Sequence, residues 1–251
     1  MEAAGIRTVI GEYAEKAREI NEGYFKYITT GMPFVIGKFA MSLDGKIATR
    51  TGSSKWITSD EVRNYAQSQR HIVDAIMVGA NTVILDDPQL TARGHSGKGG
   101  RTKSQPTRVI VDGKGRVPTT ARIFSEPGKT LVALADNFEN REKSKVRREG
   151  TEYIILKAKD GLFDLKELLK ILGHKQITTV MVEGGSGLLG NLFDAHLIDK
   201  VVAFISPLII GGEKAKSAVG GIGVAEISDA LKLKQIKIEK FNDEFLVSGY
   251  L

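Results

Sequence analysis

The chain has 251 residues, 41% of them hydrophobic and 26% charged, which is typical of one large globular domain. It contains no cysteine, and this excludes a disulfide framework, thiolate zinc or iron–sulfur sites and a cysteine nucleophile. No apolar run approaches the roughly 18–20 residues of a membrane helix, so we expect a cytoplasmic protein. The formal net charge of +6 favours anionic partners, either a nucleic acid or a phosphorylated metabolite with a phosphorylated cofactor.

The first 33 residues are expected to form a connector segment that precedes a main domain of residues 34–251. A helix is predicted over Glu12–Asn21, and apolar residues at near-helical spacing predict that one face of the segment packs on the main domain. These residues are Tyr13, Ala17, Ile20, Tyr24 and Tyr27. Gly31 and Pro33 are stop signals that end the segment before the first strand.

Short segments rich in β-branched residues alternate with helix-period segments along the main domain. This order predicts an α/β fold with a mostly parallel central sheet flanked by helices. The predicted strands are Phe34–Ala40, Ala75–Gly79, Arg108–Val111, Thr130–Ala133, Tyr153–Leu156, Thr179–Val182 and Val201–Ile205. The predicted helices are Asp60–Arg70, with Thr58 or Ser59 as its cap, Asp164–Leu172 and Leu188–Ala195. Near the C-terminus, Leu233–Lys240 and Phe245–Leu251 flank the turn Asn242-Asp243 and predict an antiparallel hairpin at one sheet edge.

The first segment that carries chemistry is KFAMSLDGKIA, residues 38–48. A lysine inside an apolar strand is unusual, because burying an unpaired ammonium is expensive. Lys38 is therefore expected either to point at solvent from a sheet edge or to meet an anion or a sugar hydroxyl. The strand breaks at Asp44-Gly45, a strong turn dipeptide.

The second segment is GSSKWITSD, residues 52–60, which leads into a predicted helix. Hydroxyl and backbone N–H groups at a helix start form a natural phosphate site, although Ser54 and Thr58 also fit ordinary helix capping. Trp56 is the single tryptophan of the chain. It is either a stacking surface for a nicotinamide or base ring, or a partly buried loop anchor.

The third segment is MVGANTVILDDPQLTAR, residues 77–93, in which a strand ends in glycine and a turn with two adjacent acids follows. In open α/β sheets ligands bind beyond the carboxyl ends of strands, which is where this segment lies. Arg93 is suited to bidentate pairing with a phosphate. The alternative is a surface ion pair between Arg93 and Asp86 or Asp87.

The fourth segment is VMVEGGSGLLG, residues 180–190, in which an apolar strand runs into a glycine-rich turn that opens a helix. Glycines let the backbone approach a pyrophosphate, and the helix N-terminus favours negative charge. The spacing is not that of the usual dinucleotide motif, so the turn alone is a weak signal. Glu183 at the strand end is stronger evidence, because a carboxylate there can hold sugar hydroxyls or move a proton. The loop 206–212 is expected to form another wall of the cleft.

Several other features point to no chemistry. The basic stretches 93–107 and 140–150 lack the interleaved aromatic residues of a single-strand nucleic-acid surface and are interpreted as solvated surface. The four histidines, at 71, 95, 174 and 196, have no ligand spacing, so no metal site is expected. The chain has no nucleophile elbow and no Walker loop, which disfavours nucleophilic hydrolysis and the use of nucleoside triphosphates.

Together and in this order, the four segments resemble the reductase domain of the riboflavin-pathway bifunctional deaminase/reductase, whose fold is similar to that of dihydrofolate reductase. The resemblance runs from about Gly31 to the C-terminus. The deaminase half looks absent, because no His-x-Glu with a Pro-Cys-x-x-Cys motif precedes the segments and no cysteine is present to bind zinc. The first 33 residues look like the connector that follows the deaminase in two-domain members.

The resemblance implies two sets of binding residues and places Lys38 beside the ribosyl chain. The 5′-phosphate and ribose of the substrate are assigned to Ser54, Arg70, Leu90, Arg93 and Glu183. The cofactor NADPH is assigned to Ala40, Trp56, Thr58, Thr82, Asp86, Gly113, Gly185, Ser186, Gly187, Leu188, Leu189, Gly190 and Asn191. We expect the strand ends that bear Lys38, Asp86 and Glu183 to converge on one pocket that is wide enough for both molecules.

The implied reaction is hydride transfer from NADPH to C1′ of ring-opened 5-amino-6-(5-phosphoribosylamino)uracil, which gives the ribitylamino product. Lys38, Asp86 and Glu183 are the candidates for the proton donor, and the sequence does not choose among them. The alternatives are reduction of the 2,5-diamino-6-ribosylamino-pyrimidinone 5′-phosphate, a dihydrofolate-type substrate, or a basic nucleic-acid-binding module without turnover. The resemblance also implies a homodimer, which would work with a separate deaminase.

Overall fold

The computed structural model describes residues 2–9, 11–93, 105–137, 150–159 and 162–251. Most of the two basic stretches discussed above, at 94–104 and 140–149, lies outside the described residues. No helix in the described part of the chain is long and apolar enough to cross a membrane.

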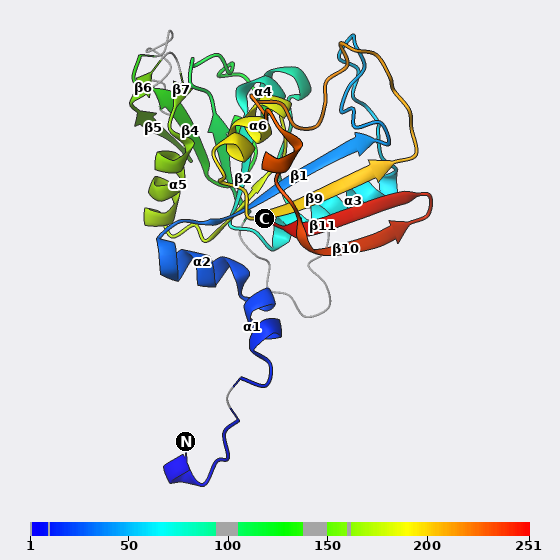
Figure 1. Ribbon diagram of the computed structural model, residues 1–251. Coiled ribbons are helices and arrows are strands. Elements are labelled where there is room, and N and C mark those ends of the chain that lie inside the picture. Colours follow the sequence, from blue (N-terminus) through cyan, green and yellow to red (C-terminus); the bar gives the residue numbers. More distant parts are fainter. Residues whose placement is uncertain (1, 10, 94–104, 138–149, 160–161) are drawn as a thin grey trace.

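Among the described residues, nine strands form one sheet in the order β10-β11-β9-β1-β8-β2-β3-β4-β5 (Figure 1). From β9 to β5 in this order, neighbouring strands pair in parallel. At the other edge, β11 pairs antiparallel with both β9 and β10. The strands are β1 (Phe34–Ser42), β2 (Ala75–Gly79), β3 (Thr107–Val111), β4 (Thr130–Ala135), β5 (Thr151–Leu156), β8 (Thr179–Val182), β9 (Lys200–Ser206), β10 (Lys234–Phe241) and β11 (Glu244–Tyr250). The predicted α/β fold, its strands and its C-terminal hairpin are confirmed. A short antiparallel pair, β6 (Ala158–Lys159) with β7 (Leu162–Phe163), was not predicted.

The helices are α1 (Ala14–Ile20), α2 (Glu22–Thr30), α3 (Asp60–Ser68), α4 (Ala80–Asp86), α5 (Leu165–His174) and α6 (Ser186–Asp194). Short 3₁₀ turns lie at Glu2–Ala4, Gln69–His71, Arg122–Phe124 and Ile227–Asp229. The helices predicted at Asp60–Arg70, Asp164–Leu172 and Leu188–Ala195 are confirmed as α3, α5 and α6. The segment of α4 was expected to be a turn, because its seven residues show no clear helical period; the helix ends at Asp86, with Asp87 as its C-cap.

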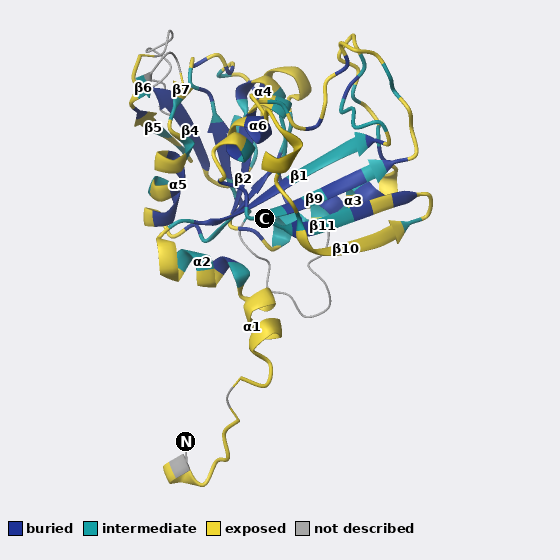
Figure 2. Ribbon diagram, viewed as in Figure 1, coloured by how far each residue is buried: buried dark blue, intermediate teal, exposed yellow. Residues whose placement is uncertain are grey.

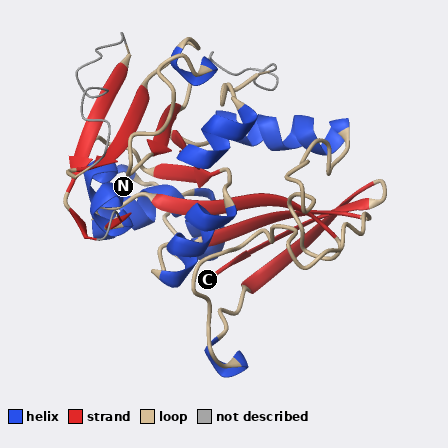
Figure 3. Cartoon of the chain, turned by 90° about the horizontal axis from the view of Figure 1, so that it is seen from above, coloured by secondary structure: helices blue, strands red, loops and turns tan. Residues whose placement is uncertain are grey.

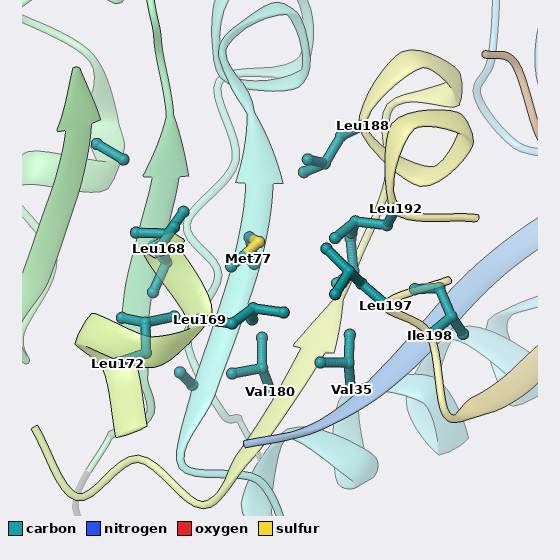
Figure 4. Packing of buried hydrophobic residues seen from close by; sticks show 14 of the residues in the cluster. Val35, Met77, Leu168, Leu169, Leu172, Val180, Leu188, Leu192, Leu197 and Ile198 are labelled. Carbon is teal, nitrogen blue, oxygen red and sulfur yellow. The ribbon is translucent and has the colours of Figure 1, made fainter. Parts of the chain in front are cut away.

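Helices cover both faces of the sheet, as the view from above shows (Figure 3). On one face, α5 and α6 form the largest apolar cluster with the strands. Figure 4 shows Leu168, Leu169 and Leu172 of α5 lying against this face, near Met77 and Val180 of the strands. On the other face, α3 and α4 cover two smaller clusters. The central parallel strands are therefore buried on both sides, as a parallel sheet requires, whereas β10 at the antiparallel edge is exposed.

The N-terminal segment does not pack as expected. Tyr13, Ile20 and Tyr24 of the predicted apolar face are 72%, 73% and 58% exposed, and α1 has no buried residue (Figures 1 and 2). The segment is attached instead by charged groups of α2: Lys26 pairs with Asp199, and Glu22 pairs with Lys200 at 2.9 Å. Helical spacing alone predicted an apolar contact with the main domain, which is wrong. The observed ion pairs could not be predicted from spacing, because their partners lie about 175 positions away in the sequence.

Gly173 marks the point where α5 touches the end of α2. A Cβ atom at this position would lie 1.9 Å from the carbonyl oxygen of Gly31, which is itself in a left-handed conformation with a φ of 70°. We therefore expect Gly173→Ala to lower the free energy of unfolding by about 1–3 kcal/mol, because the backbone must shift. Gly187→Ala is the matched control, since its Cβ would meet nothing within 4 Å. Equal denaturant midpoints for the two variants would contradict this packing.

Candidate active site

Two cavities adjoin beyond the carboxyl ends of β2, β3 and β8, which is where open α/β sheets bind ligands. The larger has a volume of about 1600 Å³ and the smaller about 240 Å³. Lys38, Ala40 and Glu183 line both cavities, so the two spaces meet at these residues. Lys38, Asp86 and Glu183, which the strand order was expected to bring together, all line the larger cavity.

A buried carboxylate flanked by two cations stands at this junction. Gly37 pairs in register with Val182, so Lys38 on β1 lies level with Glu183 at the end of β8. The Lys38 ammonium is 3.6 Å from Oε2 of Glu183. Arg70 binds the same carboxylate through two bonds, from Nε to Oε1 at 2.6 Å and from Nη2 to Oε2 at 2.9 Å. The side chains of Lys38, Arg70 and Glu183 are 17%, 12% and 8% exposed, so the cluster is largely shielded from water.

The two cations fix the charge state of Glu183. Burial alone would raise the pKa of this carboxyl, but the charges of Lys38 and Arg70 and their hydrogen bonds outweigh burial and lower the pKa to about 2. Glu183 is therefore ionised at neutral pH. It can accept hydrogen bonds from a sugar, but it carries no proton to donate.

Arg70 also ties the cluster to the neighbouring loop. It lies in the 3₁₀ turn that follows α3, and its Nη1 donates to the carbonyl oxygen of Thr91 at 3.0 Å. The start of α3 is held in turn by the C-terminal hairpin, since Glu244 accepts a hydrogen bond from the backbone N–H of Ser59 at 3.0 Å. Ser59 is the cap of α3, as its side chain accepts from the N–H of Val62. The Arg70 guanidinium is thus held by Glu183 and Thr91, and the hairpin holds the start of the helix that precedes it.

The smaller cavity is strongly cationic. Lys38, Arg63, Arg70 and Arg93 line it, and Glu183 is the acidic residue among its lining residues. Trp56 forms one wall, with 66% of its surface exposed. The Arg63 guanidinium lies 4.2 Å from the centre of the indole ring, so one face of the ring is covered and held in place.

The larger cavity is bounded by the start of α6. Gly184 and Gly185 adopt φ angles of 108° and 79°, a conformation that favours glycine. A Cβ atom on Gly185 would lie 3.2 Å from Oγ1 of Thr82 on α4. The turn therefore brings backbone N–H groups of the α6 N-terminus to the cavity without side chains in front of them.

Most residues expected from the sequence line one of the two cavities. In the larger cavity lie Lys38, Ala40, Ser54, Thr82, Asp86, Gly113, Glu183, Gly185, Ser186, Gly187, Leu188, Leu189 and Asn191. In the smaller lie Lys38, Ala40, Trp56, Thr58, Arg70, Arg93 and Glu183. The grouping differs from the expected one in places: Ser54, expected beside the substrate, lines the larger cavity, while Trp56 and Thr58, expected beside the cofactor, line the smaller.

Two expected residues line neither cavity. Leu90 is 4% exposed and packs in the apolar core beneath α4, with a φ of 51°. Gly190 faces the backbone of Gly220, where a Cβ atom would come within 2.2 Å.

Several charged residues that were not predicted from the sequence also line the cavities, among them Lys55, Asp164, Asp194 and Lys216 in the larger. Arg63 lies in the smaller, and Lys114 and Arg116 in the larger. The signal for the latter pair was present, because a predicted strand ends directly before the basic turn Gly113–Arg116. Among the described residues, no cluster of three His, Asp or Glu side chains is arranged to hold a metal ion.

Known proteins resemble this chain in sequence and in fold. A family model described as the RibD C-terminal domain matches residues 33–247. The chain belongs to the RibD C-terminal domain family. A riboflavin biosynthesis protein RibD from Aquifex aeolicus is 38% identical over 244 residues, and the chain spans only 65% of its length.

Another relative of the RibD C-terminal domain has nearly the same extent as this chain. It is a 2,5-diamino-6-ribosylamino-4(3H)-pyrimidinone 5′-phosphate reductase from Methanothermobacter thermautotrophicus, 34% identical over 215 residues, which are 86% of this chain and 96% of that protein. A crystal structure of a diaminohydroxyphosphoribosylaminopyrimidine deaminase/5-amino-6-(5-phosphoribosylamino)uracil reductase from Thermotoga maritima is also similar. Its TM-score is 0.81 at 32% identity, covering 99% of this chain and 65% of that chain.

The ion cluster predicts a specific pH dependence of stability. In Glu183→Gln the two cations remain buried without their counter-charge, so the free energy of unfolding at neutral pH should fall by roughly 3–5 kcal/mol. Because folding lowers the pKa of Glu183 from its ordinary 4.5 to about 2, its contribution is complete above pH 4.5 and is lost as the pH falls towards 2. The difference between wild type and variant, measured by denaturant unfolding, should shrink over this range. A constant difference would contradict the assignment of this pKa.

Proposed function

We propose that the chain is an NADPH-dependent reductase of riboflavin biosynthesis that reduces 5-amino-6-(5-phosphoribosylamino)uracil to its ribitylamino product. The observation that carries the proposal is the junction of the two cavities at Lys38 and Glu183, with cations gathered on one side and a glycine-lined helix start on the other. The names of the Aquifex, Methanothermobacter and Thermotoga relatives support the same reaction class.

The residues of the larger cavity fit a nicotinamide dinucleotide. The bare backbone at Gly184 and Gly185 allows a pyrophosphate to approach, and the start of α6 favours its negative charge. The cavity also extends from the turn after β3, beside Gly113, to the junction at Ala40, which gives room for an elongated ligand. NADPH, when bound, supplies the hydride that C1′ of the substrate accepts.

The smaller cavity suits the phosphorylated end of the substrate. Arg93 is exposed beside it, and Arg70 and Lys38 add positive charge. With the phosphate held there, the ribose extends to the junction, where Glu183 accepts hydrogen bonds from sugar hydroxyls. Reduction of C1′ requires opening of the sugar ring, in which the ring oxygen gains a proton.

Lys38 is the group that we propose as the proton donor. Glu183 is ionised and Asp86 is an exposed carboxylate, whereas the Lys38 ammonium stands at the junction of the cavities. Glu183 then acts by holding Lys38 and the sugar in position. Because the reacting groups are positioned together, much of the rate acceleration comes from orientation.

Turnover distinguishes the proposal from its alternatives. Purified chain is mixed with NADPH and, separately, with the deaminated uracil substrate, its 2,5-diamino counterpart and dihydrofolate, and the loss of NADPH absorbance is followed. We expect consumption that depends on the deaminated substrate. Consumption with the diamino compound alone would favour the second candidate, which the 96% coverage of the archaeal reductase supports. Salt-sensitive oligonucleotide binding without turnover would indicate the nucleic-acid module instead.

Arg93 provides a test of the phosphate site. Arg93→Ala should raise the KM of the substrate by roughly 10- to 100-fold and leave the KM of NADPH nearly unchanged, because charge-assisted pairing is lost on one side only. Arg122→Ala is the matched control, as Arg122 lines neither cavity and pairs with Glu126. An unchanged substrate KM in steady-state kinetics would remove Arg93 from the site.

We further propose a cytoplasmic homodimer that receives its substrate from a separate deaminase. An apolar patch on the edge hairpin supports a contact between copies. Ile236 and Ile238 of β10 are 56% and 67% exposed, and Phe245 of β11 is 41% exposed. The register pairs Ile238 with Val247 and Lys240 with Phe245, so these apolar side chains share one face of the sheet.

A further inference from the structure

The segment that follows β9 runs from the end of that strand to α6 as irregular backbone. We call residues 207–223 the strap. Lys216, Ala218, Gly221 and Ile222 of the strap line the larger cavity, whereas the described residues that line the smaller cavity come from other segments. Figure 1 shows the strap beside the loop after β1, beyond the ends of β1 and β9. A cavity wall of irregular backbone keeps its place only if other groups bind its N–H and C=O groups.

Asp44, in the turn after β1, binds the first part of the strap. Its Oδ1 accepts a hydrogen bond from the backbone N–H of Ile210 at 3.0 Å, and its Oδ2 accepts from that of Gly211 at 2.7 Å. The Ser42 hydroxyl donates to the same Oδ1 at 2.6 Å. These bonds, that from the hydroxyl first, lower the pKa of the Asp44 carboxyl to about 2, so the bonds to the strap are charge-assisted at neutral pH. Asp44 itself is not among the described residues that line either cavity.

Backbone bonds continue this attachment along the loop after β1. The N–H of Ile47 donates to the carbonyl oxygen of Lys216 at 2.9 Å, and the N–H of Ala218 donates to that of Gly45 at 3.2 Å. Ile47, Lys216 and Ala218 line the larger cavity. The strap and the loop after β1 therefore form one wall of this cavity, and Asp44 joins the two segments at its base.

The last part of the strap packs on the first turn of α6. The N–H of Gly220 donates to the carbonyl oxygen of Ser186, the first residue of α6, at 3.0 Å. Asp194, at the end of α6, accepts from the N–H of Ile222 at 2.6 Å and from the N–H of Gly223 at 3.0 Å. The strap thus connects the turn after β1 to the helix start at which we place the pyrophosphate of the cofactor.

We infer that Asp44 is a positioning residue for the cofactor: it holds the strap against the start of α6 and thereby sets the affinity of the larger cavity for NADPH. Asp44 needs no contact with the dinucleotide in this role. If loss of its bonds leaves the strap in place in only a fraction of the molecules, the apparent dissociation constant rises by the inverse of that fraction. The smaller cavity keeps its affinity, because its walls come from other segments. The inference rests on the dinucleotide placement of the proposed function.

Asp74 offers a matched control, because it makes the same kind of contact at the opposite end of the strands. Its Oδ2 accepts from the backbone N–H groups of Thr178 at 2.9 Å and Thr179 at 3.2 Å, and from the Thr178 hydroxyl at 2.6 Å. Asp74 directly precedes β2 and Thr178 directly precedes β8, so these bonds lie at the amino ends of the strands, away from the cavities. Asp74→Ala therefore removes a similar set of bonds without a change in the strap.

Calorimetric titration with NADP⁺ and amide hydrogen exchange test the inference without turnover. Asp44→Ala should raise the dissociation constant of NADP⁺ roughly 10-fold or more and speed the exchange of the backbone amides at 216–223. Asp44→Asn keeps one acceptor oxygen and should change both quantities less. Asp74→Ala should leave both at their wild-type values. In the turnover assay, Asp44→Ala should raise the KM of NADPH and leave the KM of the substrate nearly unchanged. Melting temperatures show whether each variant is folded.

The outcomes separate the inference from the function on which it rests. An unchanged dissociation constant in Asp44→Ala, or an equal rise in Asp74→Ala, overturns the role of Asp44 and leaves the reductase proposal standing. Faster exchange of the strap with unchanged NADP⁺ affinity overturns it as well, because the strap would then not serve the cofactor. If Asp44→Ala does not fold, Asp44→Asn decides by the same criteria. Failure of the wild type to bind NADP⁺ overturns the dinucleotide placement itself.

Discussion

The interaction on which the site depends is the ion cluster of Lys38, Glu183 and Arg70. Three ionisable side chains are taken largely out of water, and each is tolerable only because the others compensate its charge. The cluster joins Lys38 on β1, Arg70 in the turn after α3, and Glu183 at the end of β8. Its geometry therefore depends on the complete fold, and the fold holds it at the junction of two cavities.

The order of strands along the carboxyl edge converts this local cluster into an extended site. β1, β8, β2 and β3 are neighbours in that order, although they are far apart in the sequence. β1 contributes the ammonium of Lys38, and β8 contributes the carboxylate of Glu183 with the glycine turn that follows it. β2 leads into the start of α4, and β3 leads into the basic turn at residues 113–116. The strands are parallel, and the register places Lys38 and Glu183 within two residues of the level at which β2 and β3 end, so these groups line one continuous cavity.

Much of this arrangement could be predicted because it follows from local sequence. Runs of β-branched residues identified the strands, and the rule that ligands bind beyond strand ends brought Lys38, Asp86 and Glu183 to one pocket. The roles assigned to these residues stay proposals. Other features depend on contacts across the chain and left no local signal. The pairing of Arg70 with Glu183 joins residues 113 positions apart, and α2 is attached by ion pairs rather than by the apolar stripe that its spacing suggested.

The central claim is that the cluster stands between the two reacting molecules. A crystal structure of the chain with NADP⁺ and the ribitylamino product tests it most directly. We predict that C1′ of the product lies beside Lys38 and Glu183, with the product phosphate in the smaller, arginine-lined cavity and the dinucleotide in the larger. A product phosphate bound in the larger cavity, or a C1′ atom remote from Lys38 and Glu183, would contradict it.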